Sequence, residues 1–237
     1  MLHQSVFLAA ALPVLSHATL LRGVDVSHYQ GIVDWAKVAS VPGMTFACVK
    51  ATEGTSYVDA QFGANWKGMH STGLVRCAYH FARPGSNATA QAIFFVKTVN
   101  AAGGFASGTK TLQLMLDLEQ TDGQSSAIVW AWTQEFVAAL KRLTGRPAIM
   151  YTGHYFWTGS VGDPSDNLDC PLWIASYNGA ALPTIPRAWS GYTFWQYGTN
   201  GAAAPGGKAA AIPGISGSSV DVDVFKYSAD TLMKFCF

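Results

Sequence analysis

Residues 112–120, LQLMLDLEQ, form an apolar run that turns acidic at Asp117 and Glu119. A buried carboxylate without compensation costs several kcal/mol, so a core strand rarely ends this way without a functional reason. Residues i and i+2 of a strand point to the same face, with Cα atoms about 6.6 Å apart at 3.3 Å per residue. The charge of one carboxylate raises the pKa of the other, so that one group keeps its proton while the other ionises. The pair is suited to cleaving a glycosidic bond, and the simpler alternative is a strand end with two solvated acids.

Strand-like segments recur on both sides of this stretch, and most are apolar on both faces, which is typical of a parallel sheet covered by helices. They are residues 20–27, 46–54, 75–83, 111–119, 148–155, 172–177, 194–198 and 220–226. Helix patterns lie between the early strands, at residues 33–40, 59–73, 87–104 and 125–145. Residues 178–193 contain Pro183 and Pro186, and residues 199–218 are rich in Gly, Ala, Ser and Pro, so neither should hold a crossover helix. We therefore expect a single-domain α/β barrel of eight strands with its helices in the first half.

Polar residues recur toward the carboxyl ends of these strands, the rim on which αβ barrels build active sites. They are Asp25, Lys50, Glu53, Tyr79, His80, Asp117, Glu119, Tyr151, Trp173, Gln196 and Asp221. The common position predicts a site at the barrel mouth.

The composition limits the possible partners of the chain. Of its 237 residues, 49% are hydrophobic and 12% are charged, and the net charge is +1 without a Lys/Arg cluster. This excludes a phosphate backbone or an anionic membrane as the main partner. Residues 2–18 are typical of a secretory signal peptide ending at Ser16-His17-Ala18, and no other stretch is long and apolar enough to span a membrane. We expect a signal peptide over 1–18, a catalytic domain over 19–237, secretion and a monomer.

The four cysteines suit an oxidising compartment. Cys48 and Cys77 occupy similar places in two strand candidates, which favours a Cys48–Cys77 disulfide and leaves Cys170 to pair with Cys236, although three connectivities are open. The zinc-ligand spacings CxxC, HxH and HExxH are absent, so neither a metal nor a cofactor is expected. Asn87, in Asn87-Ala88-Thr89, is an N-glycosylation acceptor.

Eight motifs, in order along the chain, resemble glycoside hydrolase family 25, the Chalaropsis-type lysozymes, which are N-acetylmuramidases acting on bacterial peptidoglycan. The motifs are GVDVSHYQG (23–31), VKATEGTSYVD (49–59), AYHFARP (78–84), LDLE (116–119), MYTGHYFW (150–157), LWIASY (172–177), WQYG (195–198) and VDVDVF (220–225). The resemblance implies a flattened (β/α)5(β)3 barrel and is closest to a secreted fungal member without wall-binding repeats. It also implies an acidic site made of Asp25, Asp117, Glu119 and Asp221, with Asp223 at the next inward position, where many relatives have Asn.

Within this resemblance we expect Glu119 to be the general acid, with a pKa raised by an ionised Asp117 and an apolar rim. Two mechanisms are open. In the favoured one, the 2-acetamido group of the substrate attacks the anomeric carbon with retention while Asp117 holds its N–H. In the other, Asp25 or Asp221 serves as nucleophile or as the base that activates water.

The supporting residues have structural alternatives. Tyr79, Tyr151, Trp173 and Tyr197 either line a sugar-binding groove or pack in the barrel, and Gln196 either donates to substrate or satisfies a neighbour. Lys50 either neutralises the acids or pairs with Glu53. His28 and His80 favour structural roles. A chitinase or N-acetylglucosaminidase is the alternative enzyme, although Met115 occupies a position that is acidic in the usual chitinase motif. A non-catalytic peptidoglycan-binding protein is the other alternative.

Overall fold

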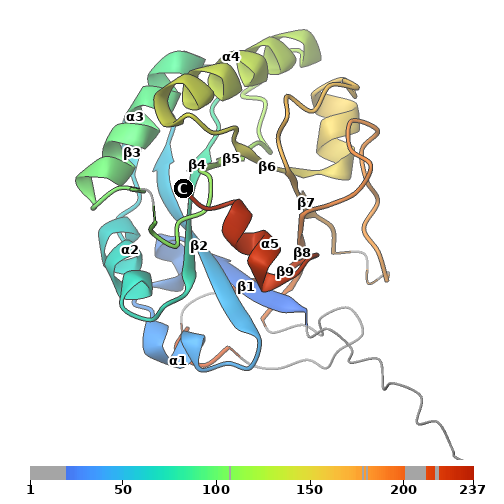
Figure 1. The fold of residues 1–237 in the computed structure, drawn as a ribbon. Helices are drawn as coiled ribbons and strands as arrows, with labels where there is room; N and C mark the ends of the chain where they lie inside the picture. The colour runs from blue at the N-terminus through green and yellow to red at the C-terminus, as the bar shows by residue number, and fades with distance from the viewer. Residues whose placement is uncertain (1–19, 107, 178, 180, 201–211, 217–218) are drawn as a thin grey trace, which may run out of the picture.

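The computed structural model describes residues 20–237 except 107, 178, 180, 201–211 and 217–218. Eight strands form one sheet in the order β1-β9-β8-β7-β6-β5-β4-β2, and pairing between β1 and β2 closes it into a barrel (Figure 1). They are β1 (Leu21–Val26), β2 (Met44–Glu53), β4 (Val75–Phe81), β5 (Met115–Asp117), β6 (Ile149–Gly153), β7 (Leu172–Ala175), β8 (Phe194–Thr199) and β9 (Asp221–Phe225). The short β3 (Tyr57–Val58) extends the edge of β2. The eight expected strands are thus confirmed, and the predicted signal peptide lies outside the described residues.

The direction of β9 corrects the expectation of a wholly parallel sheet. It pairs antiparallel with both β1 and β8, whereas the other seven strands of the barrel run parallel to one another. Parallel strands need a crossover connection of a dozen or more residues, usually a helix, whereas antiparallel neighbours do not. Asp221 therefore reaches the rim from the amino end of its strand, not from the carboxyl end.

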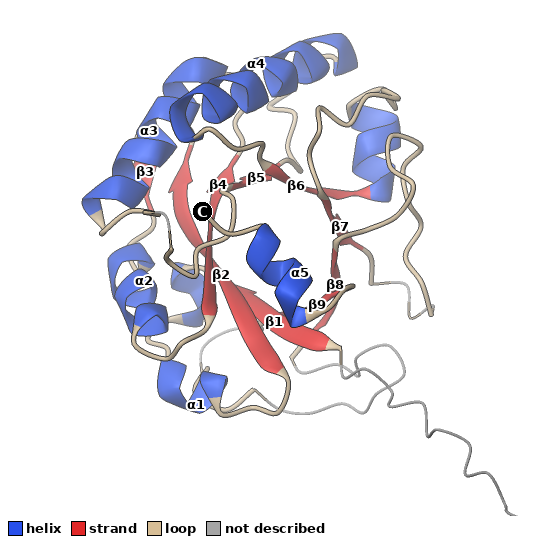
Figure 2. Ribbon diagram, viewed as in Figure 1, coloured by secondary structure: helices blue, strands red, loops and turns tan. Residues whose placement is uncertain are grey.

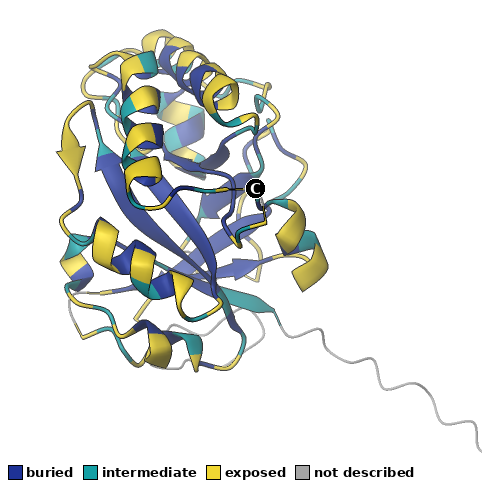
Figure 3. Ribbon diagram, turned by 60° about the vertical axis from the view of Figure 1, so that its left-hand side comes forward, coloured by how far each residue is buried: buried dark blue, intermediate teal, exposed yellow. Residues whose placement is uncertain are grey.

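The four expected helices are present and cover one side of the barrel (Figure 2). They are α1 (Trp35–Ala39), α2 (Phe62–His70), α3 (Ala88–Ala101) and α4 (Ser126–Thr144). Local signals fix the ends of two of them: the Asn87 side chain accepts from the Ala90 amide at the start of α3, and Gly145 ends α4 in a left-handed conformation. The outer faces of the helices are exposed while the strands beneath are buried (Figure 3).

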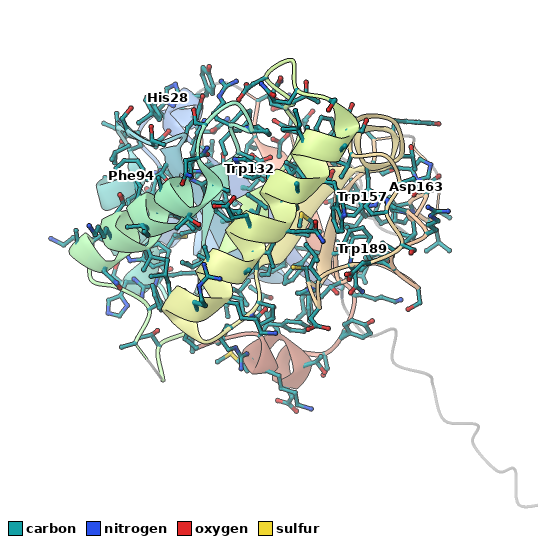
Figure 4. All side chains as sticks on the ribbon, turned by 90° about the horizontal axis from the view of Figure 1, so that it is seen from above. His28, Phe94, Trp132, Trp157, Asp163 and Trp189 are labelled. Atoms are coloured by element: carbon teal, nitrogen blue, oxygen red, sulfur yellow. A yellow bond between two sulfur atoms is a disulfide. The ribbon has the colours of Figure 1, made fainter. Side chains whose placement is uncertain are left out.

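The other side of the barrel has less helix, as the sequence predicts. The described part of 178–193 contains no helix, and most of 199–218 lies outside the described residues. A π-helical turn, η2 (Phe156–Ser160), brings Trp157 against Trp189, with ring centroids 4.6 Å apart (Figure 4). The 3₁₀ turn η1 (His28–Gln30), η2 and the terminal helix α5 (Ala229–Lys234) were not predicted.

Alternation along the strands divides the buried residues into two layers. One layer lies between the barrel and its covering elements, and the other fills the barrel. Phe46, Cys77, Trp173, Phe194 and Phe225 belong to the inner layer, and α5 lies across the end of the ring, where its Leu232 joins them (Figure 1). Every second residue of a strand points into the barrel. Along the strands these inward residues are apolar at the end near α5 and become polar toward the opposite end of the barrel.

The predicted Cys48–Cys77 disulfide is confirmed, between residues paired in register on β2 and β4 with Cα atoms 4.2 Å apart. The predicted Cys170–Cys236 pair is wrong, because both are free, buried thiols. Cys170 packs in the outer layer before β7, whereas Cys236 belongs to the inner layer after α5, so the barrel wall separates their surroundings.

Candidate active site

A cleft of about 340 Å³ opens at the barrel end opposite α5. Its walls combine carboxylates with aromatic and amide side chains. The lining residues are Asp25, Val26, Ser27, Tyr29, Gln30, Lys50, Tyr79, Phe81, Met115, Asp117, Glu119, Tyr151, Gln196, Ser219 and Asp221. The four predicted acids, and the predicted Lys50, Tyr79, Tyr151 and Gln196, therefore come together in one cleft.

Asp117 and Glu119 form one wall. Asp117 ends β5 and is 6% exposed, whereas Glu119 lies beyond the strand and is exposed. Among the described residues, Asp117 Oδ1 has no hydrogen-bond partner, so a buried acceptor is available for a ligand. Although the residue is exposed overall, desolvation of its carboxyl group raises the pKa of Glu119, whereas the charge of Lys50 lowers it. Burial, with Glu119 and Asp25 nearby, raises the pKa of Asp117 well above its ordinary value.

These pKa shifts correct the expected division of charge between the two acids. Of the two expected causes of the raised pKa of Glu119, desolvation acts and a charge on Asp117 does not, whereas the pKa of Asp117 is itself raised by burial and by Glu119. The reason is position: Asp117 is inside the strand register, where water is excluded, while Glu119 reaches the open cleft. An ionised Asp117 would require a ligand that supplies a donor.

Asp25 and Asp221 form the wall opposite Asp117. They are paired in register on β1 and β9, and β9 is four strands from β5 in the eight-stranded ring, hence diametrically across it. Burial and the charge of Asp221 raise the pKa of Asp25 to about 8. Burial and Glu119 raise the pKa of Asp221 to about 6, while a hydrogen bond from Tyr177 lowers it. Of the two carboxyl groups, Asp221 therefore has the lower pKa and ionises first as pH rises.

Gln196 connects three strands at the base of the cleft. Its Nε2 donates to Asp25 Oδ2 at 2.6 Å, while its Oε1 accepts from the Tyr151 hydroxyl at 2.7 Å and from the Tyr177 hydroxyl. We expected Gln196 either to donate to substrate or to bond its neighbours, and its bonds here correspond to the second role. Its amide fixes the orientation of the Asp25 carboxyl group.

Lys50 combines both of its expected roles. Its Nζ lies 2.6 Å from Glu53 Oε2, and Arg83 binds the other Glu53 oxygen, so Glu53 is its direct partner. Lys50 also lines the cleft, and its charge lowers the pKa of both Asp117 and Glu119. It is therefore a cation that moderates the acidic site.

Three predicted substrate-binding residues lie outside the cleft. Trp173 is 0% exposed in the barrel interior, where it stacks on Phe194 with ring centroids 4.6 Å apart. Tyr197 follows the inward-facing Gln196, so strand alternation turns it to the outer layer, where it packs near Trp195. Asp223 points inward below Asp221 but is 0% exposed. None of the three residues lines the cleft, so their contact with substrate stays a prediction that this arrangement does not favour.

Sequence reasoning missed several residues of the cleft. Phe81 and Met115 lie two positions from the predicted Tyr79 and Asp117, and both line the cleft. Tyr29 follows Ser27 and His28 on the η1 turn, and Tyr177 bonds Gln196. Because side chains two residues apart on a strand point to the same face, the predicted Tyr79 and Asp117 already indicated Phe81 and Met115. Tyr29 and Tyr177 lie on a turn and a loop, where the sequence has no such repeat.

The two histidines have structural partners, as expected. His28 Nδ1 lies 2.7 Å from Asp59 Oδ2. His80 is fully buried between Thr52 and Gln91, at 2.8 and 2.9 Å, and burial lowers its pKa to about 4. Asn87 is exposed at the start of α3, so its position is compatible with glycosylation. Within the described ranges, no group of three or more His, Cys, Asp or Glu side chains is arranged to hold a metal ion.

Comparison with known proteins gives matches over most of the chain. The sequence profile described as "Glycosyl hydrolases family 25" matches residues 24–206. Lysozyme M1 of Streptomyces globisporus is 37% identical over 221 residues, covering 90% of this chain and 70% of the relative. An N,O-diacetylmuramidase of a Chalaropsis species is 35% identical over 187 residues, covering 74% of this chain and 87% of the relative. The crystal structure of a lysozyme from Streptomyces coelicolor aligns with a TM-score of 0.82 and 35% identity, over 92% of this chain and 98% of that one.

Proposed function

The chain belongs to glycosyl hydrolase family 25, and we propose on this basis that it is an N-acetylmuramidase. In this proposal it hydrolyses the β-1,4 bond between N-acetylmuramic acid and N-acetylglucosamine in bacterial peptidoglycan. The observation that carries the proposal is the cleft with Asp117 and Glu119 on one wall and Asp25 and Asp221 on the other. A sugar between these walls has a proton donor on one side and carboxylates facing the other.

Glu119 is the general acid in this proposal. It reaches the open cleft, and its raised pKa favours the protonated form that gives a proton to the leaving glycosidic oxygen. As the bond from that oxygen to the anomeric carbon breaks, the oxygen takes the proton and Glu119 becomes a carboxylate. The same carboxylate then accepts a proton from the water that attacks the anomeric carbon.

The 2-acetamido group of the substrate is the proposed nucleophile. Its carbonyl oxygen bonds to the anomeric carbon as the glycosidic bond breaks, and water later opens the cyclic intermediate with overall retention. Asp117 supports this route, because its Oδ1 is a buried acceptor without a partner among the described residues. An acetamido N–H donating to that oxygen satisfies it, orients the carbonyl and stabilises the positive charge that develops on the nitrogen.

In the direct alternative, Asp25 or Asp221 attacks the anomeric carbon or activates water. Asp221 suits this alternative better than Asp25 does, because its pKa of about 6 is the lower of the two and it ionises first as pH rises. In the acetamido route the same charge stabilises the oxocarbenium-like transition state. Mass spectrometry of enzyme trapped during turnover separates the routes: a glycosyl adduct on an aspartate contradicts substrate assistance, as does full activity on a substrate without the acetamido group.

A chitinase or N-acetylglucosaminidase is the second candidate, because a D-x-E pair at an aromatic barrel mouth also suits chitin. Met115 lines the cleft at the position before Asp117 on the same face, so the longer acidic run of chitinases is interrupted in the site itself. Clearing of a bacterial wall suspension, without release of oligomers from chitin, is the expected result for a muramidase. The reverse pattern would assign the second candidate.

Residues 2–18 and the disulfide support secretion, with a mature chain beginning near Thr19. The monomeric state stays a prediction. None of the helices in the described residues has the length and apolar character needed to cross a membrane. Sequencing the amino terminus of protein recovered from culture medium tests the cleavage site. Intact residues 1–18 on the secreted protein would contradict it.

A further inference from the structure

Asp223 is a fully buried acid whose surroundings do not balance a charge. Its side chain is 0% exposed, inside the barrel next to Gly23 and Gln196 in the strand register. Its Oδ1 accepts a hydrogen bond from Trp173 Nε1 at 2.9 Å. Its Oδ2 is buried and, among the described residues, has no donor within reach. An ionised carboxylate in this position would lack the second donor that its burial demands.

The Asp223 side chain is also in hydrogen-bond contact with Asp25. Asp25 already accepts from Gln196 on its Oδ2. Two carboxyl groups in such contact require a proton between them, because two carboxylates have only acceptors to offer each other. Asp223 is fully enclosed, whereas Asp25 borders the cleft and already has the Gln196 donor, so a charge costs more on Asp223 and the proton belongs on its Oδ2.

The other charged groups nearby reinforce this assignment. The titratable groups that interact electrostatically with Asp223 are Asp25, Asp221, Tyr177 and Tyr197. The cations Arg22 on β1 and Lys50 on β2 have other partners, since Arg22 bonds Tyr197 and Lys50 bonds Glu53. Burial and the charge of Asp25 accordingly raise the pKa of Asp223 well above its ordinary value.

We propose that Asp223 stays protonated at the working pH and donates a hydrogen bond to Asp25. It is then a neutral positioning residue of the active site. Asp25 is then held from two sides, by the Gln196 amide and by the Asp223 hydroxyl, with its carboxyl group facing the cleft. Once Asp25 ionises, the pair carries one negative charge in place of two, so it adds less to the proton affinity of Asp117 and Glu119. The proton assignment is independent of the substrate, whereas its catalytic consequence rests on the proposed function.

Asp223→Asn is the informative variant, because its amide accepts from Trp173 and donates to Asp25 without a titratable proton. The infrared spectrum at neutral pH should lose one carboxylic-acid C=O band relative to the parent. A group with a raised pKa in the folded state stabilises it at low pH and loses that contribution as pH rises through the folded pKa. The unfolding midpoint of Asp223→Asn should therefore increase relative to the parent as pH rises, while the exposed Asp230→Asn, on α5, should show no such trend.

An unchanged C=O region, or a midpoint difference that does not grow with pH, would overturn the assignment. Both readouts are made without substrate, so they remain decisive even if the protein proves inactive on peptidoglycan. Absence of turnover in the parent would instead contradict the proposed function.

Kinetics tests the positioning role. Asp223→Asn should keep a kcat close to that of the parent, and the alkaline limb of its kcat/KM profile should not move, because the site charge is unchanged. Asp223→Leu, which cannot donate to Asp25, should lose about 10²-fold in kcat, as expected for a misplaced catalytic group. A shift of the Asp223→Asn alkaline limb to lower pH would mean that the parent residue is ionised, and equal kcat values for the Asn and Leu variants would refute the positioning role.

Discussion

Replacing Glu119 with Gln separates its chemical role from its structural one. The change keeps the shape of a side chain that reaches the cleft and removes only the proton that leaves for the glycosidic oxygen. Loss of general acid catalysis costs about 10²–10⁴-fold in rate, which corresponds to roughly 2.7–5.4 kcal/mol of transition-state stabilisation. The loss should fall on kcat in an assay of reducing ends released from purified peptidoglycan, with KM much less affected.

The same variant should change stability in the opposite direction. Because burial raises the pKa of Glu119, the folded parent loses stability as pH rises through that pKa. The amide introduced by Glu119→Gln cannot ionise, so the unfolding midpoint of the variant should increase relative to the parent on the alkaline side. Glu135→Gln is the matched control: Glu135 is exposed on α4 and accepts a hydrogen bond from Thr89 at 2.8 Å, remote from the cleft. Parent-like turnover in Glu119→Gln, with the substitution confirmed by mass, would refute the assignment.

Three further outcomes follow from the site and the barrel. Asp117→Asn should lose about 10²–10³-fold in kcat, as for a lost transition-state contact, and near-parent turnover would remove Asp117 from the chemistry. Lys50→Met should move the alkaline limb of kcat/KM to higher pH, because Lys50 lowers the pKa of both acids; a shift to lower pH would contradict this. Replacing Cys48 and Cys77 together by Ser, at a separation of 29 residues, should lower the free energy of unfolding in urea by roughly 3–4 kcal/mol from the loop-closure entropy, and an unchanged value would exclude that contribution.

The barrel was largely predictable because its segments carry strong local signals. The 3.6-residue spacing of α4, its basic last turn and Gly145 marked a helix within one residue of its observed bounds. The short α5 has no comparable signal, because six residues hold too little periodicity and its position depends on packing against the barrel interior. The antiparallel direction of β9 likewise depends on the path of the chain before the strand. The residues of a strand do not indicate in which direction it will run.

The acids of the site were predictable, whereas their surroundings were less so. Asp25, Asp117 and Asp221 were found from strand ends and motifs, but depth along the barrel decides which inward residues meet a ligand. Tyr197 was excluded by strand parity, which the sequence does contain. Trp173 and Asp223 do point into the barrel, as predicted, but they lie too far below the rim to reach the cleft. The depth of a residue in the barrel depends on the tilt and register of all its strands, which the sequence does not show directly.

In the proposed function, this cleft cleaves the bond on the reducing side of N-acetylmuramic acid. The decisive experiment is mass spectrometry of borohydride-reduced products from purified peptidoglycan, with Glu119→Gln as the inactive control. The products should end in reduced muramic acid and be absent from the control reaction. Products that end in reduced glucosamine would contradict it and identify a glucosaminidase.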